Sequence, residues 1–193
     1  FLSEIQLLEA IMKDFGLNVR EKNRLAFVSE FNRFLLSESQ AGNNVVLIID
    51  EAQNLKTRQL EQIRLLSNLE TDKDKLMQIV LVGQPELNRK LALYGLRQLR
   101  QRVMVRCHIG PLAEDELSRY IEHRLSVVGA LNSIRFSEEA LKIIWEFSCG
   151  VPRLVNIICD RALLAGFVRE TRILDEDILR QCLEELGSYF ALR

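Results

Sequence analysis

Val45-Val46-Leu47-Ile48-Ile49-Asp50-Glu51 is a run of five apolar residues that ends in two adjacent carboxylates. The apolar run predicts a strand buried on both faces, as in a parallel sheet that helices cover on both sides. The carboxylates then lie at the carboxyl edge of the sheet, where open α/β sheets bind ligands. There Asp50 can hold Mg²⁺ and Glu51 can act as general base on a water. Ordinary loop acids after a buried strand are the alternative, and the heptad alone does not decide between the two.

The composition is that of a soluble globular protein, with 48% apolar and 27% charged residues among 193. This length allows one large domain or two small ones. The formal net charge of −1 provides no global basic field that would favour nucleic acid or an anionic membrane. No apolar run approaches the roughly 18 residues that a spanning helix needs, and the amino end has no signal-peptide pattern. We therefore expect no membrane segment in this chain.

The cysteines lie in four separate segments without any C-x-x-C spacing, which predicts reduced, buried thiols. They are Cys107, Cys149, Cys159 and Cys182. With only two histidines in addition, no metal cluster is expected. Reduced thiols fit a cytoplasmic location, and any association with an inner membrane would depend on regions or partners outside this chain.

Periodic apolar residues predict helices around the first strand. Ser3–Gln6 has the spacing of a capping box, and the helix that follows it is expected to end before Gly16. A second helix is predicted over about 22–39, and a third begins near Lys56. Residues 71–75 are predicted to form a solvated loop.

Two further strands are predicted before the character of the chain changes. Met77–Gly83 is a second buried run, and Val103–Ile109 alternates in the manner of a one-sided strand. From Ala113 onward only helices are predicted, over about 113–128, 137–148, 152–169 and 175–186, with Ser137 and Asp175 as caps. We therefore expect an α/β region over 1–111 and an all-helical domain over 112–193.

Gln84 ends the second strand, just as the carboxylates end the first. If the two strands are neighbours, its amide can orient a water or touch a terminal phosphate beside Asp50. A turn glutamine before Pro85 is the ordinary interpretation.

Residues 87–113 contain no acid but six basic side chains. These are Arg89, Lys90, Arg97, Arg100, Arg102 and Arg106. Arginine stabilises charge on a transferring phosphoryl group, and Arg102 stands directly before the third predicted strand. A solvated basic face and a nucleic-acid patch are the alternatives.

Arg153 follows Gly150 and Pro152 at the predicted start of a helix. An arginine at a helix amino end can reach an anion shared with another domain, although an exposed helix start is the simpler interpretation. Cys149 has no supporting histidine pattern, which favours a small buried thiol over a nucleophile. Trp145 and Phe147 are expected in the helical core.

The order of these features resembles that of the AAA+ ATPases. Val45–Glu51 resembles Walker B, and Gln84 resembles sensor 1. Arg102 resembles the arginine finger, although any arginine of 97–106 can take that place. Arg153 resembles sensor 2. Three longer strings are similar to the general secretion pathway protein A family, and equally to pilus-biogenesis relatives of the mannose-sensitive haemagglutinin M type. These strings are Leu47–Leu55, Arg64–Thr71 and Ile79–Leu87.

One element of that family is missing. Its Walker A loop, G-x-x-x-x-G-K-[ST], precedes the carboxylate strand, yet none of the nine glycines here is followed by lysine and Ser/Thr. The backbone N–H groups and the lysine that cradle phosphates are therefore absent. We expect an incomplete P-loop NTPase (AAA+) parallel sheet flanked by helices, followed by a helical lid, in a fragment that binds nucleotide weakly or not at all.

For the longer parent, the resemblance implies ATP and Mg²⁺ as ligands, homo-oligomerisation, and assembly proteins of a secretion or pilus system as partners. Oligomerisation follows because an arginine finger acts on a neighbour's nucleotide. Two alternatives remain: a DNA-handling ATPase of the transposition type, and a non-enzymatic protein-interaction module.

Overall fold

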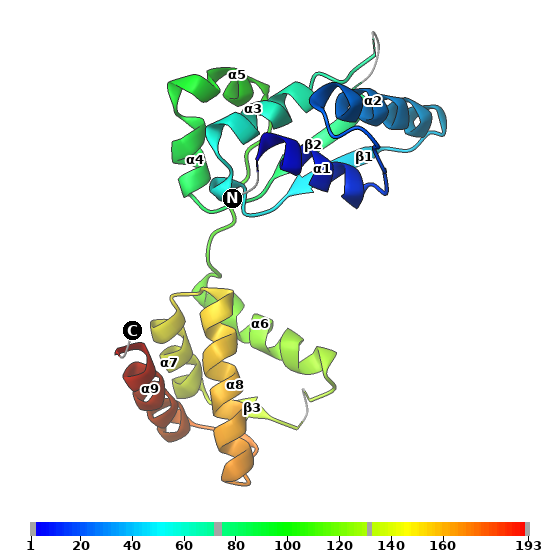
Figure 1. The fold of residues 1–193 in the computed structure, drawn as a ribbon. Helices are drawn as coiled ribbons and strands as arrows, with labels where there is room; N and C mark the ends of the chain where they lie inside the picture. Colours follow the sequence, from blue (N-terminus) through cyan, green and yellow to red (C-terminus); the bar gives the residue numbers. More distant parts are fainter. Residues whose placement is uncertain (1–2, 72–74, 131–132, 192–193) are drawn as a thin grey trace. The chain divides into compact units, whose positions relative to one another are not determined.

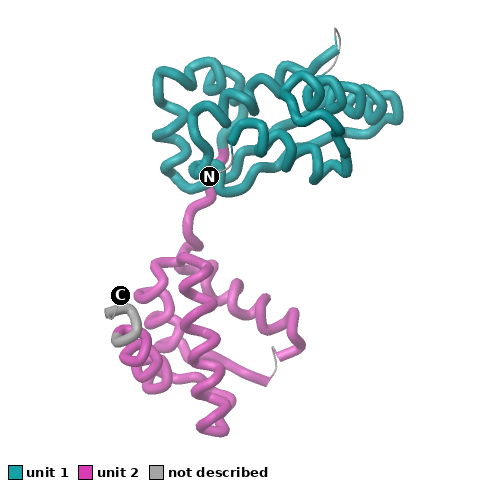
Figure 2. The backbone as a smooth tube through the Cα atoms, in the orientation of Figure 1, with its two compact units in different colours: residues 1–106 teal, residues 107–193 magenta. Residues whose placement is uncertain are grey.

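The computed structural model describes residues 3–71, 75–130 and 133–191. These residues form two compact units, 1–106 and 107–193, which are coloured separately in Figure 2. Most of the predicted loop 71–75 lies outside the described residues. None of the described helices is long and apolar enough to cross a membrane.

The first unit is built on a two-stranded parallel sheet. Strand β1 (Val45–Ile49) pairs with β2 (Met77–Leu81) in the register Val45 to Met77 and Ile49 to Leu81. Helix α3 (Thr57–Leu66) lies between them in the chain, as a parallel connection requires. Both predicted strands of this pair are therefore present and adjacent (Figure 1).

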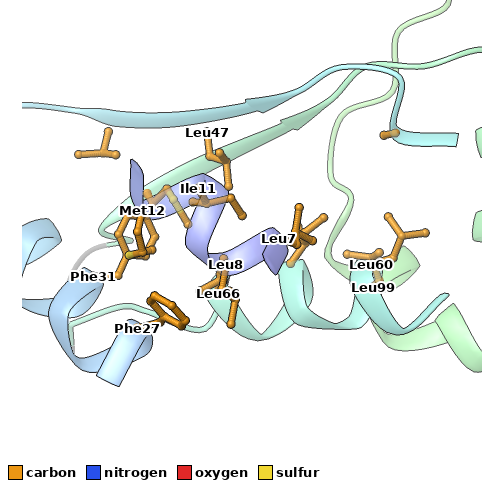
Figure 3. Close-up of a cluster of buried hydrophobic side chains, with 14 of the residues drawn as sticks. Leu7, Leu8, Ile11, Met12, Phe27, Phe31, Leu47, Leu60, Leu66 and Leu99 are labelled. Atoms are coloured by element: carbon orange, nitrogen blue, oxygen red, sulfur yellow. The ribbon is translucent and has the colours of Figure 1, made fainter. Parts of the chain in front are cut away.

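Helices α1 (Glu4–Asp14), α2 (Arg24–Gln40) and α3 lie on one side of the strands. Figure 3 shows Leu7, Leu8, Ile11 and Met12 of α1 between Leu47 of β1 and side chains of α2 and α3. Ser3 and Gln6 form the predicted capping box at the start of α1. The start of α2 is capped in the same way, because the Asn23 side chain accepts from Ala26 N.

The opposite face of the sheet is not buried, which corrects the prediction that β1 is covered on both faces. Val46 is 41% exposed and Ile48 is 64% exposed, while Val45 and Leu47 between them are buried. On β2, Val80 is likewise 42% exposed. The reason is that no described helix packs on this face.

The predicted third strand is also wrong. After α4 (Glu86–Leu91), η2 (Tyr94–Leu96) and α5 (Arg97–Arg102), residues 103–113 have no regular structure. Met104 and Val105 are each 84% exposed. An alternating sequence becomes a strand only when a neighbour satisfies its backbone groups, and no described strand lies beside this one.

The second unit contains α6 (Glu114–Val127), α7 (Glu138–Ser148), α8 (Pro152–Val168) and α9 (Glu176–Ala191). Ser137 and Asp175 accept hydrogen bonds from Ala140 N and Ile178 N, which confirms them as caps. The prediction that this region contains only helices missed one short pair of parallel strands, β3 (Arg135–Phe136) with β4 (Ile173–Leu174). Trp145 and Phe147 are partly buried against the core of this unit, as expected.

Candidate functional site at the carboxyl edge of the sheet

The turns that follow β1 and β2 lie side by side. Backbone pairing continues past both strands, because Val82 N donates to Ile49 O at 2.9 Å and Ala52 N donates to Val82 O at 2.9 Å. Ala52 is fully buried, so the turn after β1 is anchored in the core. The structure thereby brings the Asp50-Glu51 turn to the Gly83-Gln84 turn, as the sequence predicted.

Asp50 and Glu51 present two exposed carboxylates at this edge. The Asp50 carboxylate is oriented by Glu51 N, which donates to Asp50 Oδ1 at 2.7 Å. Glu51 has a left-handed backbone, with φ 52° and ψ 34°, which is uncommon for a residue with a long side chain. This conformation ends the strand sharply and turns the chain into the 3₁₀ helix η1 (Ala52–Asn54).

The two turns are joined by Gln53, to which the sequence analysis assigned no role. Gln53 Nε2 donates to Glu51 Oε2 at 2.6 Å, and Gln84 N donates to Gln53 Oε1 at 3.1 Å. One amide side chain therefore contacts both the carboxylate and the predicted sensor turn. Its place two residues after Glu51 was the available signal, but only the pairing of β1 with β2 brings Gln84 within its reach.

Lys90 is engaged within the first unit and does not present its ammonium group to an anion. Its Nζ donates to the carbonyl of Leu55 at 2.7 Å and to the carbonyl of Gln53, so it caps the 3₁₀ helix. This ammonium group stabilises the turn that carries the carboxylates.

Arg102 lies on the same unit, and its Nη1 donates to Ser67 O at 3.3 Å and to Ser67 Oγ at 3.4 Å. These long contacts hold an exposed guanidinium loosely at the end of α3. Arg89, Arg97 and Arg106 are exposed, and Arg100 reaches the carbonyl of Ala92, at 3.5 Å. Which arginine of 97–106 serves as a finger stays a prediction.

Arg153 is exposed in the first turn of α8, directly after Pro152. It belongs to the second unit, so its reach toward Asp50 and Gln84 stays a prediction.

Cys149 is exposed and has a left-handed backbone, with φ 46°, which corrects the expectation of a buried thiol there. Cys107 is exposed as well, and only Cys159 and Cys182 are buried as predicted.

The donor set at the edge of the sheet suits Mg²⁺ better than a transition metal. Among the described ranges no group of three His, Cys, Asp or Glu side chains is gathered as a metal cage. Mg²⁺ uses one or two carboxylates together with waters and phosphates. Asp50 supplies such a carboxylate, whose Oδ1 is oriented by Glu51 N.

Comparison with known proteins identifies a matching family and a sequence relative. Residues 3–91 match the family described as AAA domain. General secretion pathway protein A of Aeromonas hydrophila is 43% identical over 188 residues, which are 96% of this chain. The chain spans about a third (34%) of the length of that relative.

Solved structures with the same fold share little sequence with this chain. The ORC2 protein of Aeropyrum pernix in its ADP form superposes with a TM-score of 0.69 at 14% identity, over 94% of this chain and 50% of that one. The RuvB Holliday junction branch migration motor of Thermotoga maritima gives 0.59 at 16% identity, over 96% and 58%. These likenesses confirm the predicted P-loop α/β fold, of which the described residues hold two adjacent parallel strands of the main sheet.

Proposed function

Since residues 3–91 match the AAA domain family, we propose that the chain is part of an ATPase that serves a bacterial secretion or pilus-assembly apparatus. The observation that carries the proposal is the meeting of the Asp50-Glu51 and Gln84 turns at one edge of a parallel sheet. The similarity to General secretion pathway protein A favours secretion over other tasks. Assembly proteins and further copies of the same protein are then its partners.

Each polar side chain of the edge has a distinct role in this proposal. Asp50 holds Mg²⁺, which neutralises phosphate charge when it is bound with ATP. Glu51 takes the proton of the attacking water, and Gln84 orients that water or the terminal phosphate. Arg102 or a neighbour in 97–106 acts on the nucleotide of an adjacent subunit, and Arg153 on the nucleotide of its own subunit.

The chain alone is proposed to bind nucleotide weakly or not at all. Phosphates are held mainly by successive backbone N–H groups of a glycine-rich loop and by its lysine, and no such sequence occurs among the 193 residues. ATP binding and hydrolysis are therefore proposed for a longer protein that joins this chain to a Walker A loop.

The decisive experiment measures ATP hydrolysis by that longer protein with Glu51→Gln. Loss of a general base is expected to lower kcat by about 10²–10⁴-fold while ATP still binds. Glu184→Gln is the matched control, since Glu184 is exposed on α9 of the second unit. Unchanged turnover in Glu51→Gln would remove Glu51 as the base, and a wild-type protein without ATPase activity would end the proposal.

A DNA-handling role is the second candidate. It is favoured by the acid-free run 87–113, in which Arg89, Arg97, Arg100 and Arg106 are exposed. Binding to duplex DNA should then weaken steeply as salt rises, because phosphate contacts release counterions. Absence of binding at low salt would exclude this role.

A further inference from the structure

We propose that Gln53 is the positioning residue that couples the catalytic carboxylate of Glu51 to the Gln84 turn, an inference that rests on the proposed ATPase function. In this role Gln53 does not contact nucleotide. It sets where the Glu51 carboxylate lies, and it passes any displacement of the Gln84 turn to that carboxylate. The bridge is the pair of hydrogen bonds from Gln84 N to Gln53 Oε1 and from Gln53 Nε2 to Glu51 Oε2.

An amide is the side chain that this geometry requires. At 3.1 Å the oxygen of Gln53 accepts from a backbone N–H, and at 2.6 Å its nitrogen donates to a carboxylate. The two bonds use opposite ends of one planar group, so a shift at one end rotates or translates the other. A carboxylate at position 53 would keep the first bond and replace the second with repulsion, while an apolar chain would lose both.

The backbone of Gln53 is held firmly, so the bridge has a fixed base. Its carbonyl accepts from Lys90 Nζ, and the preceding Ala52 is fully buried and donates to Val82 O. Glu51 lies in a left-handed turn outside any strand or helix, and its carboxylate accepts a hydrogen bond from Gln53 Nε2.

Gly83 leaves the space that the bridge occupies. A Cβ at this position would lie 2.6 Å from Gln53 Oε1 and 3.3 Å from Gln53 N. Real Cβ atoms do not approach that closely, so any larger residue would displace the Gln53 amide. The glycine before Gln84 is therefore explained by the close approach of the Gln53 side chain.

The test measures kcat and KM for ATP in the longer, ATPase-competent protein. Gln53→Met and Gln53→Glu are expected to lower kcat by about 10- to 100-fold, because a displaced base costs rate. KM for ATP should change by less than about twofold, because Gln53 makes no nucleotide contact. Gln40→Met, at the exposed end of α2, is the matched control and should behave as wild type.

A double variant separates positioning from a merely structural role. If Gln53 acts through Glu51, adding Gln53→Met to Glu51→Gln should lower kcat no further. Wild-type kcat in Gln53→Met, or losses that multiply in the double variant, would overturn the inference. A normal loss in Glu51→Gln alongside either result would leave the proposed function standing. Wild-type activity in Glu51→Gln would remove Glu51 as the base, and only a wild-type protein without ATPase activity would end the proposed function.

Discussion

Lys90 Nζ lies 2.7 Å from the carbonyl oxygen of Leu55 and donates a hydrogen bond to it. Together with the carbonyl of Gln53, this bond ties helix α4 to the 3₁₀ helix that follows the two carboxylates. The turn that carries Glu51 is thus held from two sides: by the backbone of Val82, directly after β2, and by one half-buried lysine.

Lys90→Met should destabilise the first unit. Removing the ammonium leaves two carbonyls without their charged donor, and hydrogen bonds to charged groups contribute about 1.5–3 kcal/mol. Urea unfolding followed by far-UV circular dichroism measures the loss. Arg89→Met, at the exposed neighbouring position, should change stability by less than about 0.5 kcal/mol, and equal effects in the two variants would contradict the assignment.

Gly83→Ala should cost about 1 kcal/mol, because the methyl group displaces the end of the Gln53 side chain and breaks its hydrogen bond with Gln84 N. The methyl would meet Gln53 Oε1 at 2.6 Å and Leu87 Cδ2 at 3.3 Å. Gly95→Ala is the control, because its Cβ would find only Thr57 Cγ2, at 3.8 Å. Thermal melting of both variants decides the matter, and a melting temperature of Gly83→Ala that matches Gly95→Ala would show that the space is free.

Gly150→Ala and Gly129→Ala separate steric overlap from backbone strain. Both glycines have left-handed backbones, with φ of 74° and 73°. A Cβ at Gly150 would lie 2.2 Å from Leu112 O and 2.9 Å from Trp145 Cζ3, whereas nothing lies within 4 Å at Gly129. Gly129→Ala should therefore cost about 1 kcal/mol and Gly150→Ala at least about twice as much.

The second unit offers a direct probe for this comparison, since Trp145 is the one tryptophan of the chain. Its fluorescence during denaturation reports the unfolding of the unit that contains both glycines. Equal midpoints for the two variants would mean that the Leu112 segment moves away from Gly150 without cost.

The thiols should fall into two reactive classes at pH 8. Burial raises the pKa of Cys159 to about 12, and burial together with Glu185 raises the pKa of Cys182. Because the thiolate is the reactive form, these two should resist a disulfide reagent that modifies the exposed Cys107 and Cys149. Counting modified thiols before and after unfolding tests this, and fast reaction of all four in the folded state would contradict the burial.

Burial of Cys159 also makes stability depend on pH. A raised pKa in the folded state means that folding favours the neutral thiol. The stabilisation is complete below the ordinary thiol pKa and is lost as pH rises from there toward about 12. Cys159→Ser should weaken this alkaline loss, as denaturant titrations at pH 8 and pH 10.5 would measure, and an identical pH dependence in the variant would contradict it.

Local features of the chain were predictable where neighbouring residues alone satisfy them. Ser3, Ser137 and Asp175 cap their helices as predicted, because each accepts from a backbone N–H three residues further along. The prediction failed at Val103–Ile109, where alternation suggested a strand that has no described partner. It also failed at Val46 and Ile48, whose apolar character says nothing about whether a helix covers them.

The amino-acid pattern was thus sufficient for the longer helices, for the two paired strands and for polar groups at both strand ends, since periodicity and capping act over a few residues. Folding alone decided that Gln53 reaches both Glu51 and Gln84, and that Lys90 supports the turn beside them. The contact of Gln53 with Gln84 spans 31 positions, and that of Lys90 with Leu55 spans 35. They exist only because parallel pairing in one register brings the ends of β1 and β2 together.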